Sequence, residues 1–396
     1  MRIGLVCSGY PPADGGGIGS YTKTLAGGIV ERGHEVVVLT TSEGADSEYV
    51  DDGVIICRVD VSKYVPMLEK ILPGISASYR VYRVLRRLQE EKPFDVVEFP
   101  NWEALGVVSQ LLMPWLPCCV RVHTPYFETL EFDKGEAITW RDKVICAQEK
   151  WSCKKAAQLV SSTKSHASLV AERYSLSVSE FSILPLGIKD RYSRQLLEEK
   201  LNRKRDQFKI LYVSRLENRK GTLLLLDALP TILKSRPDIH VDFVGKDRPH
   251  APGNIYFSDY FAQRFEVFSS QVSFHGYLGD EVLDELYREA DLFVVPSQYE
   301  SFGLIYAEAL MFGLPCIATD GGGIGEVVSD GLDGVLLKQG TLEEIAAAVD
   351  EFHSDFEKIR VTSLVARSSF EQRFQDHLLI ENSLELYKNI DSKFAR

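Results

Sequence analysis

The chain has 396 residues, 45% of them hydrophobic and 26% charged. This length predicts two or three domains, and this composition excludes a disordered chain, a collagen-like repeat and a coiled coil. Its 45 Lys and Arg residues are outnumbered by 57 Asp and Glu residues, so the net charge is −12. A general nucleic-acid-binding protein needs a basic surface, so that class is excluded and no nucleic-acid partner is expected.

Seven cysteines are spread along the chain without a CxxC pair, which predicts reduced thiols rather than disulfides or a zinc site. The apolar run at the N-terminus is too short for a signal peptide. No stretch approaches the roughly 18 apolar residues of a membrane-spanning helix. We therefore expect a cytoplasmic protein, with the inner membrane surface as an alternative location.

The first half of the chain predicts alternating strands and helices. Residues 3–7 are a continuous apolar run typical of a buried strand, an amphipathic helix is expected at 20–32, and the next strand at 35–40. This βαβ order implies parallel pairing with a right-handed crossover. Further strands are expected at 54–58, 95–99, 118–123, 159–162 and 182–184.

A charged stretch at 190–206, expected to be a short exposed helix or linker, interrupts the pattern. A strand at 208–213 then restarts it, followed by strands expected at 239–244, 272–275, 292–296, 315–318 and 334–337. The sequence therefore predicts two α/β domains in tandem. The first, residues 1–190, has 21 basic and 24 acidic residues, against 24 and 33 in residues 191–396, so the acidity lies mainly in the second.

A glycine-rich motif occurs once in each predicted domain, as Asp-Gly-Gly-Gly-Ile-Gly at 14–19 and again at 320–325. Each copy follows a predicted strand and opens a predicted helix, at the end of the sheet where open α/β folds bind ligands. Glycines let the backbone approach a ligand closely, and a helix N-terminus offers free N–H groups to anions. Ser20 stands where a dinucleotide-binding GxGxxG motif needs its last glycine, and residues 220–222 lack the upstream glycine of a P-loop.

Two loops of the second domain carry charged residues suited to a nucleotide diphosphate. Arg215 and Lys220 follow the strand at 208–213, where they could bind phosphate as a planar fork and a point charge. Glu300 follows the strand at 292–296, and Gly303 near the start of the next helix places free N–H groups beside it. Glu308 comes about one turn later, within reach of a ribose diol.

These motifs resemble the retaining glycosyltransferases of family 4, which have the GT-B fold. The resemblance covers nearly the whole chain and rests on features in the family's order, namely Gly15–Gly19, Ser214-Arg215-Leu216 with Lys220-Gly221, Glu300 and Glu308 around Glu-Ser-Phe-Gly-Leu, and Gly321-Gly322 with Glu326. It implies two Rossmann-like α/β/α domains facing a deep interdomain cleft. The acceptor domain would span residues 1–190, the donor domain 191–371, and a terminal helix at about 372–396 would cross back to the first domain.

The resemblance also implies a role for each matching residue. The expected catalytic residues are Glu300, His123, Arg215 and Lys220. The donor diphosphate is expected at Arg215, Lys220, Gly303, Leu304, Gly16 and Gly17. The donor sugar is expected at Glu300, Ser301, Phe302, Gly303 and His123, the ribose at Glu308, and the base at the backbone of Tyr277 and Leu278. Gly325 stands where the family commonly has Pro, so the contact of that loop with the donor sugar is less well specified.

The implied activity is transfer of a hexose from a UDP- or GDP-linked donor, with retention, to a saccharide, lipid-linked or small-molecule acceptor in carbohydrate biosynthesis. No Asp-x-Asp motif is present, so neither a metal nor another cofactor is required. A GT-B phosphorylase, an epimerase and a non-catalytic sugar-nucleotide-binding protein remain alternatives. The base, the sugar, the acceptor and the oligomeric state are left open.

The segment 63–92 combines apolar residues with four arginines, at 80, 83, 86 and 87. It has two interpretations, a weak peripheral contact with anionic lipid and an ordinary surface helix with solvated arginines. The acidity of the whole chain favours the second.

Overall fold

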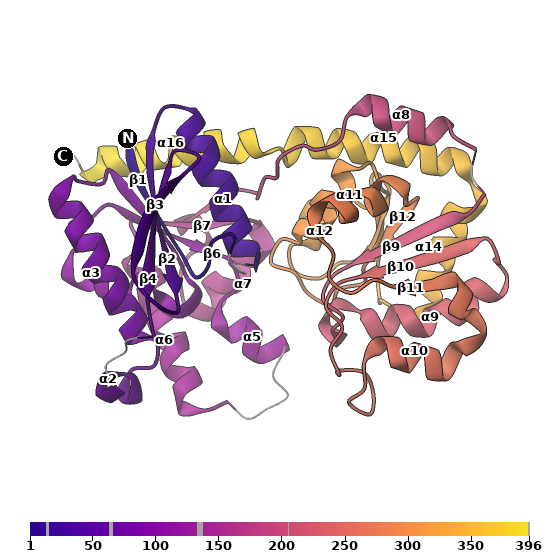
Figure 1. The fold of residues 1–396 in the computed structure, drawn as a ribbon, viewed down its shortest axis with the longest axis horizontal. Coiled ribbons are helices and arrows are strands. Elements are labelled where there is room, and N and C mark those ends of the chain that lie inside the picture. The colour runs from indigo at the N-terminus through magenta and orange to yellow at the C-terminus, as the bar shows by residue number, and fades with distance from the viewer. Residues whose placement is uncertain (13–15, 63–65, 133–137, 205, 395–396) are drawn as a thin grey trace. The chain divides into compact units, whose positions relative to one another are not determined.

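The computed structural model describes residues 1–12, 16–62, 66–132, 138–204 and 206–394 (Figure 1). The chain divides into two units. Unit 1 comprises Met1–Lys189 and Asp376–Arg396, and unit 2 comprises Asp190–Gln375. Gly15 of the first glycine motif and residues 63–65 of the segment 63–92 lie outside the described residues. No helix of the described part is long and apolar enough to cross a membrane.

Unit 1 is built on an eight-stranded sheet in the order β3-β4-β2-β1-β5-β6-β7-β8. Its strands are β1 (Arg2–Cys7), β2 (Glu35–Ser42), β3 (Ser47–Asp51), β4 (Val54–Asp60), β5 (Val96–Pro100), β6 (Cys118–Val122), β7 (Gln158–Ser161) and β8 (Phe181–Ile183). Its helices are α1 (Gly16–Glu31), α2 (Pro66–Ile71), α3 (Ile75–Glu91), α4 (Val107–Leu112), α5 (Tyr126–Phe132), α6 (Trp140–Lys155), α7 (Lys164–Tyr174) and α16 (Asp376–Phe394). All strand pairs are parallel except β3 with β4.

Unit 2 is built on a six-stranded parallel sheet in the order β11-β10-β9-β12-β13-β14. Its strands are β9 (Phe208–Val213), β10 (Ile239–Val244), β11 (Val272–Phe274), β12 (Leu292–Val294), β13 (Cys316–Thr319) and β14 (Gly334–Leu337). Its helices are α8 (Arg194–Asn202), α9 (Thr222–Lys234), α10 (Phe257–Phe265), α11 (Asp280–Glu289), α12 (Leu304–Met311), α13 (Ile324–Val327), α14 (Leu342–Ser354) and α15 (Phe356–Arg373). The order of the strands reverses between β9 and β12, which makes this sheet doubly wound.

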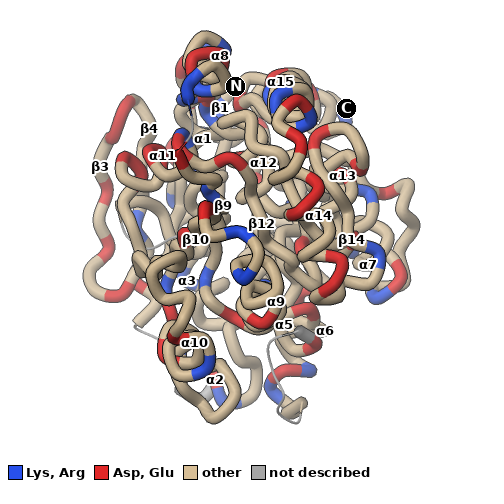
Figure 2. The backbone as a smooth tube through the Cα atoms, turned by 90° about the vertical axis from the view of Figure 1, so that its right-hand side faces the viewer, with Lys and Arg blue, Asp and Glu red and all other residues tan. Residues whose placement is uncertain are grey.

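The charged stretch at 190–206 contains the helix α8. Acidic and basic residues both occur along it (Figure 2), but Leu197 and Leu201 are buried, so one face of this helix packs on unit 2. The expectation of an exposed element therefore describes only the outer face of α8.

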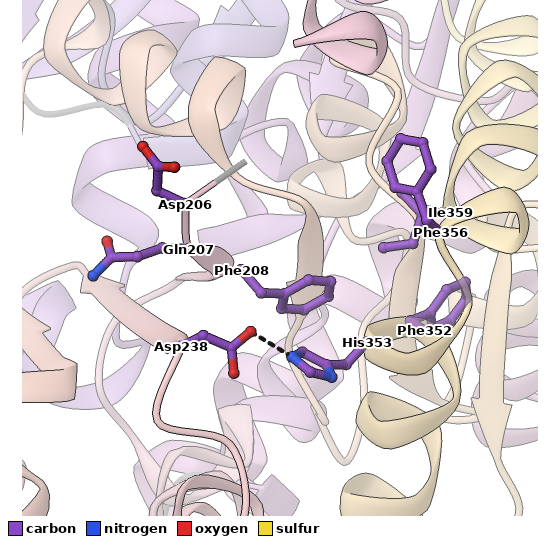
Figure 3. Close-up of a pocket in the computed structure, with 8 residues that line it drawn as sticks. All are labelled: Asp206, Gln207, Phe208, Asp238, Phe352, His353, Phe356 and Ile359. Carbon is purple, nitrogen blue, oxygen red and sulfur yellow. Dashed lines mark hydrogen bonds and ion pairs between the residues drawn. The ribbon is translucent and has the colours of Figure 1, made fainter. Parts of the chain in front are cut away.

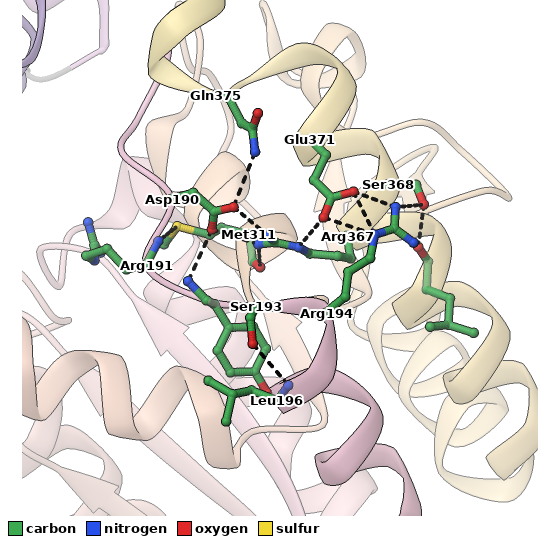
Figure 4. Close-up of polar contacts among 12 residues, drawn as sticks. Asp190, Arg191, Ser193, Arg194, Leu196, Met311, Arg367, Ser368, Glu371 and Gln375 are labelled. Atoms are coloured by element: carbon green, nitrogen blue, oxygen red, sulfur yellow. Dashed lines mark hydrogen bonds and ion pairs between the residues drawn. The ribbon is translucent and has the colours of Figure 1, made fainter. Parts of the chain in front are cut away.

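The chain enters and leaves unit 2 through segments that are bonded to each other (Figure 4). Arg367 of α15 forms an ion pair with Asp190 and donates a hydrogen bond to the carbonyl of Met311 at 2.7 Å. Gln375 Nε2 donates to Asp190 Oδ2 at 3.2 Å. On the side of unit 1, the N–H of Asp376 donates to the carbonyl of Ile188 at 3.1 Å.

A buried ion pair organises the centre of unit 1. Arg121 of β6 lies 3.1 Å from Glu98 of β5, and both side chains are almost fully enclosed. Tyr21 of α1 donates to Glu98 Oε1 at 2.7 Å, and Tyr387 of α16 donates to Glu98 Oε2 at 2.8 Å. A buried carboxylate needs such partners because it has lost its hydration. The C-terminal helix is thus bonded to the central strands of unit 1.

We predict that Arg121→Ala lowers the free energy of unfolding of unit 1 by about 3–5 kcal/mol, because it leaves the Glu98 carboxylate buried without its counter-charge. Urea unfolding followed by circular dichroism measures this change. Arg86→Ala, which breaks the exposed pair between Arg86 and Glu90, is the control and should have little effect. Equal losses in the two variants would contradict a special role for the buried pair.

Candidate functional site

The candidate site of unit 2 lies at the carboxyl ends of β9 and β12, where the strand order reverses. This is the position at which open α/β sheets form a ligand-binding crevice. The loop after β9 contains Arg215 and Lys220, and the loop after β12 contains Glu300 and Gly303. The topology therefore brings two segments about 85 residues apart in the sequence to one edge of the sheet.

Lys220 and Glu300 form an ion pair in which each side chain is only 12% exposed. Ser297 also donates to Glu300 Oε1, at 3.1 Å. Burial lowers the pKa of Lys220, while the charge of Glu300 opposes that change. Lys220 is therefore a nearly enclosed cation, and the Glu300 carboxylate is the partner of its ammonium group.

Gly221 permits the contact between these two loops. Its backbone has φ +70°, and a Cβ at this position would overlap the carbonyl of Pro296. A larger residue would be strained by this φ and would also push the loops apart. The N–H of Gln298 donates to the carbonyl of Arg219 at 2.9 Å, which joins the loops beside Gly221.

The second glycine motif, after β13, is joined to the Glu300 loop. The N–H of Glu300 donates to the carbonyl of Gly321 at 3.3 Å, and the N–H of Gly323 donates to the carbonyl of Glu300 at 2.7 Å. A Cβ at Gly321 would overlap the carbonyl of Gln298. The loops after β9, β12 and β13 thus form one bonded assembly, with Glu300 at its centre.

The helix α12 begins directly after this loop. Gly303 is its N-cap residue with φ +88°, and Leu304 is its first residue. The side chain of Phe302 is buried and its ring packs edge-on against Phe374 at 5.7 Å, and Ser301 is partly buried. Phe302 can therefore offer its backbone, but not its ring, to a ligand, and the first N–H groups of α12 are suited to an anion.

Arg215 is placed differently from Lys220. Its guanidinium lies 3.1 Å from Glu217 Oε1, and its side chain is 48% exposed. From the sequence, the two cations were expected to act together on the diphosphate. In the structure each has its own carboxylate, and Lys220 is enclosed whereas Arg215 lies at the surface. Arg215 is therefore the cation that can rotate toward a ligand at low energetic cost.

Glu308 lies in the second turn of α12 and is partly buried. Tyr287 of α11 donates to Glu308 Oε2 at 3.2 Å, and burial raises the pKa of Glu308 to about 6 although the charge of Arg191 opposes the change. Arg191 is itself held by Asp284, at 3.0 Å. The sequence analysis did not identify Tyr287, because no motif marks it. This tyrosine holds Glu308, the residue expected to bind the ribose.

The segment expected to bind the base follows β11. The side chain of Tyr277 is 75% exposed, and Leu278 is partly buried. His275 Nε2 lies 2.7 Å from Asp242 Oδ1, so this histidine anchors the turn. The carbonyl of Gly276 accepts a hydrogen bond from the N–H of Gly245 at 2.8 Å. The turn is thereby tied to the end of β10, and the exposed ring of Tyr277 has the ammonium group of Lys246 5.8 Å from its centroid.

In unit 1, Gly16 and Gly17 open α1 and are exposed, with open space where a Cβ would stand.

His123 follows β6, and its backbone N–H donates to Asn101 Oδ1 at 2.8 Å. The edge of its ring meets Tyr21 at 5.1 Å. Burial and the charges of Arg121 and His166 lower the pKa of His123 to about 3, so its ring is neutral at physiological pH.

A separate cavity of unit 2, of about 190 Å³, lies beside the start of β9 (Figure 3). Phe208, Phe352 and Phe356 form its apolar walls, and His353 Nε2 lies 2.8 Å from Asp238 Oδ2. Because Phe208 is the first residue of β9 and Lys220 follows its last, this cavity lies at the opposite end of the strand and is not part of the site.

Each unit matches a protein-family model. Residues 193–363 match the model described as glycosyl transferases group 1, and residues 16–187 match the glycosyl transferase 4-like domain. An uncharacterized glycosyltransferase of Methanocaldococcus jannaschii is 27% identical over 366 residues, which cover 90% of each chain.

Solved structures share the fold. Sucrose-phosphate synthase from Thermosynechococcus elongatus aligns with a TM-score of 0.81 and 21% identity, covering 99% of this chain and 100% of that one. Anabaena HepE in complex with UDP and glucose aligns with a TM-score of 0.72 and 17% identity, covering 98% and 99%. These glycosyltransferase structures have the GT-B fold, which the sequence predicted.

The depressed pKa of His123 predicts how the stability of unit 1 depends on pH. The unfolded chain takes up a proton on this histidine near its ordinary pKa, whereas the folded chain does so only near pH 3. Stability is therefore lost as the pH falls below about 6.5, by up to about 2 kcal/mol between about pH 7 and pH 5. As the pH is lowered from about 7 to about 5, the urea midpoint should fall less steeply for His123→Gln than for the wild type. Parallel plots of urea midpoint against pH for the two proteins would contradict a neutral His123 ring.

Proposed function

The chain belongs to the glycosyl transferases group 1 family, and from this premise we propose that it is a retaining glycosyltransferase that uses a UDP- or GDP-linked sugar without a metal. The observation that supports this best is the Lys220–Glu300 pair at the switch point of unit 2, beside the N-terminus of α12. A cation, a carboxylate and free N–H groups suit a diphosphate joined to a sugar.

In this proposal, the donor diphosphate binds against Lys220 and the first N–H groups of α12, and Arg215 moves from Glu217 to the phosphates. Negative charge develops on the diphosphate as the bond to the sugar breaks. Once the donor has bound and Arg215 has moved, both cations are in place before the bond breaks and stabilise that charge without further reorganisation. The enclosure of Lys220 strengthens the effect because little water screens it.

The carboxylates of the site accept hydrogen bonds from the hydroxyl groups of the donor. Glu300 accepts from the sugar hydroxyls and Glu308 from the ribose, with Tyr287 holding the second oxygen of Glu308. The neutral ring of His123 can donate or accept a hydrogen bond at the reacting sugar, but it cannot supply a cation at neutral pH. Transfer then goes to a hydroxyl of the acceptor, whose oxygen bonds to the anomeric carbon while its proton passes to the diphosphate, and the diphosphate leaves with the electron pair of the broken bond.

We predict that Lys220→Ala and Arg215→Ala each lower kcat for sugar transfer by about 100- to 1,000-fold, because each removes a cation that stabilises the leaving diphosphate. Lys209→Ala, at the opposite end of β9, is the control and should keep its activity. The donor is first identified by thermal shift against UDP, GDP and ADP sugars, since a bound ligand raises the melting temperature. Turnover near the wild-type value in either site variant would contradict the proposed role.

We also predict full activity in an excess of a metal chelator, because the proposal assigns the charge of the leaving group to Lys220, Arg215 and the start of α12. The measurement is nucleotide release and product formation with and without the chelator. Activity that vanishes with chelator and returns with added divalent cation would show that a metal bridges the phosphates.

A further inference from the structure

The exposed face of α6 in unit 1 is basic and aromatic. Its cations are Arg141, Lys143, Lys150, Lys154 and Lys155. The acidic residues of this helix, Asp142 and Glu149, are both buried on its inner side. All of the charge that α6 presents to solvent is therefore positive, in a chain whose net charge is −12.

These cations differ from the arginines of α3. Arg80, Arg86 and Arg87 pair with Asp46, Glu90 and Glu48, respectively. Within the described residues, no ion pair is found for the five cations of α6. Arg141 and Lys155 lie over the rings of Trp140 and Trp151, at 5.9 and 6.0 Å. The surface of α6 thus keeps its positive charge, whereas that of α3 is largely neutralised.

The two tryptophans occupy the middle of this face. Trp140 and Trp151 are eleven residues apart, which places them within about 20° of each other around the helix. Lys143, Lys150 and Lys154 lie on one side of this line and Lys155 on the other. Trp140 is 55% exposed, and Ile138 just before the helix is 57% exposed. An aromatic line flanked by cations is typical of a helix lying in a lipid interface.

The neighbours of α6 extend the apolar surface on one side, because Gln148 and Ser152 are four residues apart and share a side of the helix. Gln148 donates to the carbonyl of Pro73 at 2.8 Å, which places α6 beside the exposed residues Ile71 and Leu72. Ser152 donates to Gln110 at 2.7 Å, which places α6 beside the end of α4. Leu111, Leu112 and Trp115, at and after that end, are exposed as well.

We propose that the face of α6 formed by Arg141, Lys143, Lys150, Lys154, Lys155, Trp140 and Trp151 docks unit 1 on an anionic lipid surface. The cations of this face attract anionic headgroups, and the aromatic line with its apolar neighbours enters the interface. A nucleic acid would also attract the cations, but it would leave the exposed aliphatic residues in water. The segment 63–92 would then add Ile71 and Leu72 rather than its arginines.

The inner side of α6 connects this surface to the His123 loop. Glu149 accepts from the N–H of Tyr126 at 2.8 Å, and Asp142 accepts from its hydroxyl group at 2.8 Å. Tyr126 begins α5, directly after the loop that carries His123. Docking through α6 would therefore orient this loop of unit 1 relative to the lipid surface.

Co-sedimentation of the full-length protein with vesicles of phosphatidylglycerol and phosphatidylcholine at low salt tests the proposal. We expect binding to these vesicles, none to pure phosphatidylcholine, and release by high salt. The triple variant Lys143→Gln, Lys150→Gln, Lys154→Gln should bind roughly 100-fold more weakly, since each basic residue near an anionic surface contributes a factor of about five. The matched control, Arg83→Gln, Arg86→Gln, Arg87→Gln, removes the same charge from α3 and should bind nearly as the wild type does.

Quenching of tryptophan fluorescence by brominated lipid provides the second readout. Quenching is expected in the wild type and should be strongly reduced in the triple variant Trp115→Phe, Trp140→Phe, Trp151→Phe, which would show that this face enters the lipid. The proposal is overturned if the wild type does not bind anionic vesicles, or if the lysine variant of α6 and the arginine variant of α3 lose binding equally. It is also overturned if the protein binds DNA but not vesicles. Circular dichroism confirms that the variants fold. No sugar donor is present in these measurements, so their failure leaves the proposed glycosyl transfer untouched.

Discussion

Unit 2 depends on keeping the ammonium group of Lys220 almost out of water. A lone buried cation would lose its proton or unfold the loop, so a carboxylate must stand opposite it. Glu300 does so only because Gly221 lets its loop touch Pro296 and because the glycine motif after β13 is bonded to the backbone of Glu300. Glycines in two loops thus serve one electrostatic arrangement at the edge of the sheet.

The alternation of apolar runs with amphipathic segments was sufficient to predict both parallel sheets. It missed β3, because Ser47–Asp51 is an exposed edge strand without the apolar run of a buried one. It also placed the start of the first helix at Ser20, because glycines have low helix propensity. The helix begins at Gly16, since the tertiary context overrides that propensity.

The members of the unit 2 site could be named from sequence because each occupies a loop after a strand, but their pairing could not. Nothing in the order of residues says that Lys220 contacts Glu300 while Arg215 contacts Glu217, or that Tyr287 holds Glu308. The basic face of α6 could not be predicted either. Asp142 and Glu149 stand among its basic residues in the sequence, and only the fold shows that both acids are buried.

The path of the chain has a consequence for its synthesis. Unit 2 is an insertion within unit 1, because residues from Asp376 onward return to the first unit and Tyr387 completes the hydrogen bonding of Glu98. During translation, all of unit 2 is synthesised before the last helix of unit 1. The Glu98 carboxylate can therefore gain its hydrogen bond from Tyr387 only after the whole of unit 2 has been made.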